Sequence, residues 1–164
     1  MVVTVPSGWQ SAPANRWEVP GKPVAAWSGP GGSSLVVYRT LPVPGGKVSD
    51  LSDGLVNRLE NMPGLRVVGW GAETVGGSEA ARVEVVAPGT GDAFAPTGTG
   101  TPVGPEGVEL KPTRRVVVSI LRDSDTLTLL WHAPESGAEA LSASVRDTLA
   151  SLKVARGTLS TSTY

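Results

Sequence analysis

His132 is the only histidine of the 164-residue chain, so any acid–base or metal chemistry that uses a histidine must begin there. It follows Trp131 at the end of a predicted strand, and Glu135 lies close by in sequence but beyond a proline. A general base or a metal ligand needs partners that orient it. Because the sequence places no such partner at a suitable spacing, we interpret His132 as an ordinary strand-end residue.

Three other segments imitate catalytic or binding motifs but fail on spacing. Segment 123–125 begins like a calcium loop, yet Leu127 and Pro134 occupy positions that need oxygen ligands, which favours a hairpin turn. The glycines of 98–104 are not framed by a strand and a helix, as a dinucleotide loop requires. Segment 31–35 lacks the closing glycine of a nucleophile elbow. We therefore predict a protein that is not an enzyme, with no catalytic, cofactor-binding or metal-binding residues.

The composition excludes several classes of function. Without cysteine the chain cannot form disulfides, thiolate nucleophiles or cysteine-ligated metal sites. A formal net charge of -1 gives no basic field for nucleic acid. We interpret the adjacent Arg114 and Arg115 as the solvated edge of a strand. No apolar run is long enough to predict a membrane span.

The beginning of the chain leaves its compartment open. It lacks the basic segment and apolar core of a signal peptide, which predicts a cytoplasmic protein as the sequence is written. The strand-like run 1–5 begins so abruptly that the alternative is an exported or envelope-associated protein from which an upstream segment has been removed. The excess of arginine over lysine, with abundant alanine, glycine and valine, is typical of a GC-rich bacterial genome.

The aromatic residues supply the candidate binding site. Five tryptophans accompany a single phenylalanine, and three of the tryptophans crowd the N-terminal third of the chain. One interpretation is that these rings fill the core where loops pack on a sheet. The other is that Trp17 above all, with Trp27 and Phe94, lines an exposed surface that binds a protein partner, because aromatic anchors are enriched in binding sites.

Hydrophobic periodicity predicts the elements that must position these residues. Alternating or β-branched runs predict strands, and apolar residues spaced 4, 4 and 3 apart predict two amphipathic helices. Residues 10–23 are predicted to be irregular. The predicted strands are 1–5, 24–27, 34–40, 65–74, 79–87, 113–122 and 126–133. The predicted helices run from Ser49 or Asp50 to Met62, with Leu51, Leu55 and Leu59 as further apolar positions, and from a Ser136 cap through Leu141, Val145, Leu149 and Leu152.

These elements predict one α+β domain over residues 1–154. The two glycines of segment 75–77 and the aspartates of 123–125 are each expected to form the turn of a hairpin. Strands 113–122 and 126–133 are apolar on both faces, which is typical of central strands covered on two sides. The Gly/Pro-rich segment 88–112 is predicted to be a long loop, and 155–164 a flexible tail. The expected architecture is an α/β/α sandwich, a curved antiparallel sheet with two amphipathic helices.

Several motifs together resemble a known family. They are Val-Pro-Ser-Gly-Trp at 5–9, Leu-Val-Val-Tyr-Arg at 35–39, the helix that ends in Met-Pro-Gly at 62–64, the hairpin 74–84, and Leu-Ala-Ser-Leu at 149–152. Over residues 1–154 the chain resembles the PsbP-like (Mog/PsbP/DcrB) α/β sandwich superfamily. The resemblance implies a non-enzymatic binding, assembly or lipoprotein-type domain, as in photosystem subunits, bacterial envelope proteins and the Eag chaperones of secreted effectors. It transfers no functional residues, because fold does not fix activity.

The sequence thus favours a non-catalytic bacterial binding or assembly module that holds a protein partner on its sheet surface or long loop. A more specific alternative is a cytoplasmic chaperone or adaptor for a secretion effector, which predicts a homodimer with an apolar groove. An alternative from another class is an enzyme or small-ligand-binding domain with a pocket near Trp70, Trp131 and His132. The sequence implies no cofactor and no nucleic acid partner.

Overall fold

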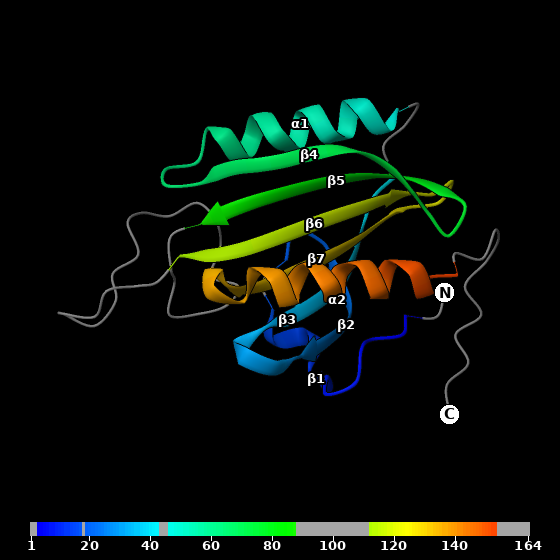
Figure 1. Cartoon of the computed structure of the whole chain (residues 1–164). Coiled ribbons are helices and arrows are strands. Elements are labelled where there is room, and N and C mark those ends of the chain that lie inside the picture. The colour runs from blue at the N-terminus through cyan, green and yellow to red at the C-terminus, as the bar shows by residue number, and fades with distance from the viewer. Residues whose placement is uncertain (1–2, 18, 43–45, 88–111, 154–164) are drawn as a thin grey trace.

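The computed structural model describes residues 3–17, 19–42, 46–87 and 112–153 of the chain. These residues form one antiparallel sheet with the strand order β1-β2-β3-β7-β6-β5-β4, and the sheet is twisted, as Figure 1 shows. The strands are β1 (Gln10–Ala12), β2 (Lys22–Ser28), β3 (Ser34–Thr40), β4 (Arg66–Val75), β5 (Ser78–Ala87), β6 (Thr113–Leu121) and β7 (Thr126–Pro134).

Two helices cover opposite faces of this sheet. α1 (Val48–Glu60) packs on Val83 of β5, whereas α2 (Ala138–Ser151) packs on Val118 of β6. Val83 lies opposite Val117 in the register, so Val118 points to the other face, because successive side chains of a strand alternate. We call the two sides the α1 face and the α2 face. The predicted α+β class and α/β/α arrangement are confirmed.

The main core lies on the α2 face. Trp131 of β7 sits at its centre with 0% of its surface exposed. Around it, alternate residues of the four middle strands meet one side of α2. The other fully buried members of this core include Leu35, Val37, Val116, Val118, Ile120, Leu129 and Val145. The prediction that β6 and β7 are central and covered on both faces is confirmed by their place between β3 and β5.

Two smaller clusters cover the α1 face. Under α1, Val56 and Leu59 pack on Val83 and Val85 of β5. Toward the other edge of the sheet, Ala12, Ala14, Trp17 and Val19 pack on β2, β3 and β7. The α1 face is therefore covered by a helix over one half and by the N-terminal segment over the other.

The N-terminal third differs most from the prediction. Residues 3–5 are not a strand, although two valines there pack on the α2-face core. Residues 10–23, predicted to be irregular, contain the edge strand β1 and the start of β2. The pairing of β2 with β3 shifts register between Pro23 and Ala25. Such an irregularity lets a strand accept a proline, which has no backbone N–H to donate.

The helices exist as predicted, but their first turns differ. Asp50 lies inside the first turn of α1, where its Oδ2 accepts a hydrogen bond from the backbone N–H of Lys47 at 3.3 Å. Ser136 does not cap α2, because it lies in a 3-10 turn, Glu135–Gly137, that precedes the helix. The buried residues of α1 are Val48, Ser52, Val56 and Leu59. Within the described ranges, no helix is both long enough and apolar enough to cross a membrane.

Both predicted hairpin turns are confirmed. Gly76 and Gly77 join β4 to β5 with φ of 57° and 84°, values that favour glycine. Between β6 and β7, the backbone N–H of Arg122 donates to the carbonyl of Asp125 at 3.0 Å. The Asp125 carboxylate also accepts a hydrogen bond from Arg122 Nε at 2.6 Å. This carboxylate therefore helps to hold the turn, and it also lies 3.8 Å from Arg39 Nη1 of β3.

Candidate functional site

The predicted binding aromatics do not form one surface in the described structure. Trp17 packs on the cluster of Ala26, Val36 and Tyr38 on β2 and β3, while Trp27 packs on the α2-face core. Both side chains are half-buried. Phe94, like all but the last residue of the predicted loop 88–112, lies outside the described residues, as does the predicted tail 155–164. That these three aromatics bind a partner stays a prediction.

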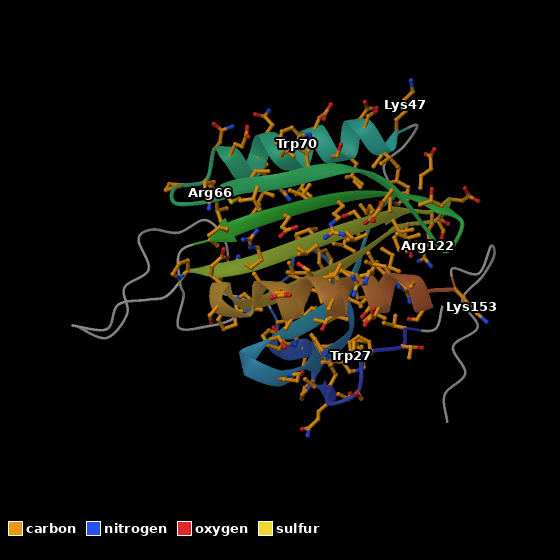
Figure 2. The ribbon with its side chains drawn as sticks, in the orientation of Figure 1. Trp27, Lys47, Arg66, Trp70, Arg122 and Lys153 are labelled. Atoms are coloured by element: carbon orange, nitrogen blue, oxygen red, sulfur yellow. The ribbon has the colours of Figure 1, made fainter. Side chains whose placement is uncertain are left out.

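The structure does not bring together the three residues of the alternative pocket. Trp131 points to the α2 face, and His132, the next residue of β7, points to the α1 face. Trp70 lies on β4 at the end of the sheet, beside α1, as Figure 2 shows. A shared pocket of these residues is therefore not part of the described structure.

Trp70 instead belongs to an exposed strip along β4. It is 59% exposed, which is unusual for a tryptophan on a strand. Val68, Ala72 and Thr74 of the same strand are exposed as well. We call these four residues the β4 strip. It lies at one edge of the sheet, where no other strand of the described residues pairs with the outer side of β4.

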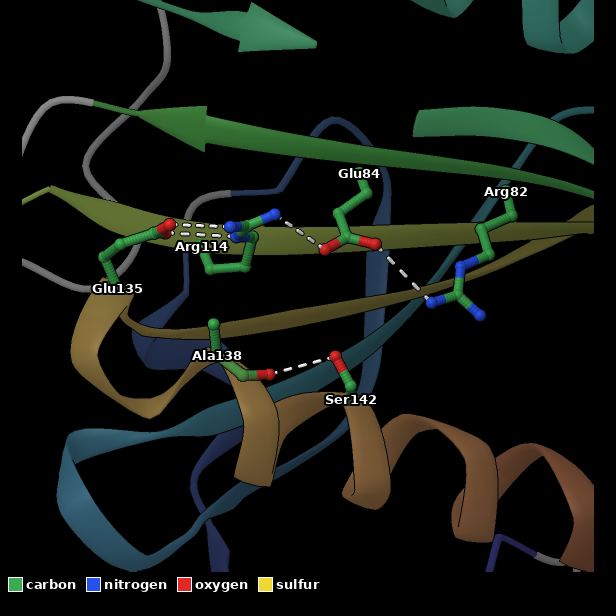
Figure 3. Close-up of polar contacts among 6 residues, drawn as sticks. All are labelled: Arg82, Glu84, Arg114, Glu135, Ala138 and Ser142. Atoms are coloured by element: carbon green, nitrogen blue, oxygen red, sulfur yellow. Dashed lines mark hydrogen bonds and ion pairs between the residues drawn. The ribbon is translucent and has the colours of Figure 1, made fainter. Parts of the chain in front are cut away.

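Arg114 is the centre of a charged ladder on the α2 face, shown in Figure 3. Its Nη1 lies 2.9 Å from Glu84 Oε1. Its Nε and Nη2 donate to the two carboxylate oxygens of Glu135 at 3.0 and 2.6 Å. The hydrogen bonds to Glu135 raise the pKa of Arg114. Because Glu84 is on β5 and Glu135 begins the turn before α2, Arg114 ties two strands to the start of a helix.

Arg115 overturns the interpretation of the arginine pair as a solvated edge. β6 lies between β5 and β7, so neither arginine is at an edge of the sheet. Arg115 is only 6% exposed, and its Nε has no hydrogen-bond partner. Burial lowers the pKa of Arg115, and no carboxylate opposes that effect. This guanidinium is a buried cation without a counter-ion among the described residues.

Three other polar residues surround Arg115 on the α1 face. In the register, Arg115 lies opposite His132, which in turn lies opposite Ser34 of β3. Thr113 is two residues before Arg115 on β6 and so points to the same face. All four residues are buried. We call them the Arg115 cluster.

The chemistry of the Arg115 cluster favours binding over catalysis. Burial, reinforced by the charge of Arg115, lowers the pKa of His132 to about 4, so the ring is neutral at pH 7. Ser34 Oγ forms no hydrogen bond with it, although the two residues are opposite each other. A nucleophile needs a base within hydrogen-bond reach, and a base with so low a pKa is weak. What remains on this face is one positive charge, with the Thr113 hydroxyl on the same strand and the Ser34 hydroxyl on the far side of His132.

Comparisons with known proteins find similar solved structures but no match to a protein family or a curated protein. No protein-family model and no curated protein matches the chain. LpqN of Mycobacterium tuberculosis, involved in cell envelope biogenesis, has 16% identity and a TM-score of 0.63 over 91% of this chain and 79% of its own. PA94 of Pseudomonas aeruginosa, a protein of unknown function, has 15% identity and a TM-score of 0.57 over 96% and 87%.

A third solved structure decides the kind of fold. Cyanobacterial PsbP (CyanoP) of Synechocystis sp. PCC 6803 has 11% identity and a TM-score of 0.51 over 89% of this chain and 81% of its own. The chain has the PsbP-like fold. Identities this low show the fold alone, so the predicted resemblance is confirmed at that level. The link to Eag-type chaperones stays a prediction.

We expect Arg114→Met to destabilise this PsbP-like sheet by about 1–2 kcal/mol, because it leaves Glu84 and Glu135 half-buried without their shared cation. Urea unfolding followed by circular dichroism measures the change. Arg146→Met is the matched control, since the Arg146 side chain is 76% exposed on α2 and should change stability little. Equal stabilities for the two variants would show that the ladder contributes nothing.

Proposed function

We propose that this chain is a non-catalytic binding module that holds an extended segment of a partner protein along the free edge of β4. The observation that carries this proposal is the β4 strip, with Trp70 59% exposed at the end of the sheet. A large ring kept in water on a strand stabilises the free chain little. It contributes much more when a partner covers it, which is why aromatic residues dominate binding sites.

The two edges of the sheet differ in a way that supports this proposal. β1, at one edge, has only three residues, which is a common way to prevent edge-to-edge pairing. β4, at the other edge, has ten residues. Its segment 67–72 contains no charged residue and no proline to block pairing. A long edge strand with an uncharged stretch at its middle is a template for an added strand.

The proposed partner is an extended peptide rather than a helix. Backbone groups along β4 would give affinity by pairing with the peptide, and the Trp70 ring would select an apolar side chain at one position. The register shift between Val67 and Gly69 bends β4 at its start. The regular pairing surface therefore begins at Gly69. A second copy of the chain pairing through the same edge is the homodimer alternative.

The envelope role of LpqN supports the exported or envelope-associated alternative for the compartment. LpqN is involved in cell envelope biogenesis and shares the fold across most of this chain. We propose the same compartment here, with the partner in the envelope. Fractionation of native cells tests this point separately from partner binding, because a cytoplasmic chain would leave the β4 proposal intact.

A photo-crosslinking residue placed at position 72 tests the proposed function. Ala72 is exposed on the β4 strip beside Trp70, so a bound segment lies within its reach. We expect a discrete heavier adduct in cells of the native organism. Trp70→Ser should reduce this adduct by about tenfold or more, as loss of a central aromatic anchor does.

The matched control places the same crosslinker at position 140, because Ala140 is exposed on α2. Adducts that form equally at both positions, or none at position 72, would contradict the proposal. An adduct of two copies of the chain would show that the bound strand comes from a second copy, which is the homodimer alternative.

The binding of a small ligand is a second candidate function, favoured by the buried charge of Arg115.

A further inference from the structure

We propose that Arg115, Ser34 and Thr113 form a binding site for a small oxyanion, a carboxylate or a phosphate, on the α1 face of the sheet. This site lies on the inner strands β3 and β6, away from the β4 strip. It would stand even if no partner binds along β4.

The charge of Arg115 is the first reason for an anion. A buried cation is costly unless it is paired, so arginines inside proteins nearly always meet carboxylates. The neighbouring arginine follows this rule, since Arg114 binds Glu84 and Glu135. Arg122 follows it too, through Asp125. Arg115 is more buried than either, and yet no carboxylate of the described residues acts on its pKa.

The unpaired hydroxyl groups are the second, independent reason. Ser34 is 3% exposed and Thr113 is 6% exposed, and neither hydroxyl has a hydrogen-bond partner in the part of the chain that the structure describes. Elsewhere on the same face, the hydroxyls of Ser119 and Thr128 satisfy each other at 3.0 Å. Thr126 and Thr148 also bury hydroxyls without a partner, but Ser34 and Thr113 share the face and the cluster of Arg115, where a bound oxyanion would supply the missing acceptor.

The surroundings leave Arg115 as the main group that would hold the anion. On β5, the residues opposite Arg115 and Thr113 are Val85 and Ala87, which offer no polar contact. Strands are about 4.8 Å apart, so Arg115 and Ser34 lie about two strand spacings from each other across His132. The long arginine side chain can bridge part of that gap. Its planar fork matches the two oxygens of a carboxylate or a phosphate.

His132 provides a direct measurement of binding. It is the only histidine in the chain and lies opposite both Arg115 and Ser34 in the register. Its ring proton signals in NMR are therefore unambiguous reporters of this cluster. We titrate the intact chain with sodium acetate and, separately, with inorganic phosphate at constant pH and ionic strength. We expect a saturable shift of the His132 signals with at least one of the two anions.

Variants distinguish anion binding at this site from general effects of salt on the His132 signals. Arg115→Met keeps the apolar stem, removes the charge, and should weaken binding at least about tenfold. Arg66→Met is the matched control, because Arg66 is an exposed arginine on another strand, and it should bind as the wild type does. If Arg115→Met does not fold, Ser34→Ala replaces it, with a severalfold loss expected.

The outcome also identifies the ligand class. Saturation by phosphate alone indicates a phosphate site, and saturation by acetate alone indicates a carboxylate site. A shift that never saturates with either anion would overturn the proposal. So would a shift of the same size and midpoint in the Arg115 or Ser34 variant as in the wild type.

Discussion

Trp131→Ala should cost about 3–5 kcal/mol of unfolding free energy, the largest loss we expect from any single substitution in this chain. Trp131 is fully buried at the centre of the α2-face core. It lies between Leu35 of β3 and Val116 of β6 in the register. Removing the ring leaves a cavity that strands hydrogen-bonded on both sides cannot close.

Trp70→Ala is the matched control for this prediction, because the residue change is the same and Trp70 is 59% exposed. It should cost less than about 1 kcal/mol. Urea unfolding of both variants, followed by far-UV circular dichroism, avoids the loss of tryptophan fluorescence as a confounding signal. Similar costs for the two variants would mean that the core does not depend on Trp131.

The indole nitrogen of Trp131 refines the expectation. Its Nε1 is buried without a hydrogen-bond partner, so the ring contributes volume rather than a polar contact. Trp131→Phe should therefore keep much of the stability that Trp131→Ala loses, at a cost of about 1–2 kcal/mol. Near-equal losses for the two variants would show that the indole N–H matters after all.

Much of the fold could be predicted because its strands obey simple periodicity. β5 alternates apolar and charged residues, and Ala81, Val83 and Val85 are indeed buried, together with Ala80 and Ala87. β6 and β7 are apolar on both faces and are indeed central. β1 was missed because Gln10–Ala12 is short and polar, and only its pairing with β2 makes it a strand. Local patterns cannot reveal such an edge strand.

The buried side of α1 shows a related limit. The spacing of Leu51, Leu55 and Leu59 predicts one apolar stripe. Leu59 is buried and Leu55 packs partly buried against the sheet, but the other buried positions of the helix are Val48, Ser52 and Val56, and Leu51 is not among them. The Ser52 hydroxyl can be buried because it donates to the carbonyl of Ser49 at 3.0 Å. Packing against β4 and β5 decided the rotation of this helix, and a single sequence does not contain that information.

The candidate site was harder to predict than the fold. Two adjacent arginines at the start of a strand are typical of a solvated edge, and that interpretation was wrong. It failed because sheet order, which places β6 between β5 and β7, is not encoded in any local pattern. Alternation along the strand then sends Arg114 toward Glu84 and Arg115 to the opposite face. One signal in the sequence could have indicated that Arg115 is buried, because alternation places it on the same face of β6 as Val117 and Ser119.

Because His132 is buried opposite Arg115, the stability of the chain should depend on the protonation of His132 below neutral pH. Burial, followed by the charge of Arg115, lowers the pKa of His132 from 6.5 to about 4. The unfolded chain therefore takes up a proton on this ring at a higher pH than the folded chain does. The stabilisation from the neutral ring is complete above pH 6.5 and is lost as the pH falls toward 4, by about 3 kcal/mol in total.

His132→Gln should remove this part of the pH dependence. The measurement is the free energy of unfolding in urea between pH 7 and pH 4 for the wild type and the variant. The carboxylates titrate in both proteins, so their contribution cancels in the difference between the two curves. We expect the wild type to lose more stability than the variant over this range, and Arg115→Met to narrow the gap by raising the pKa of His132. Parallel curves would mean that His132 titrates in the folded chain as it does in the unfolded one, and the ring would then have to be in contact with water.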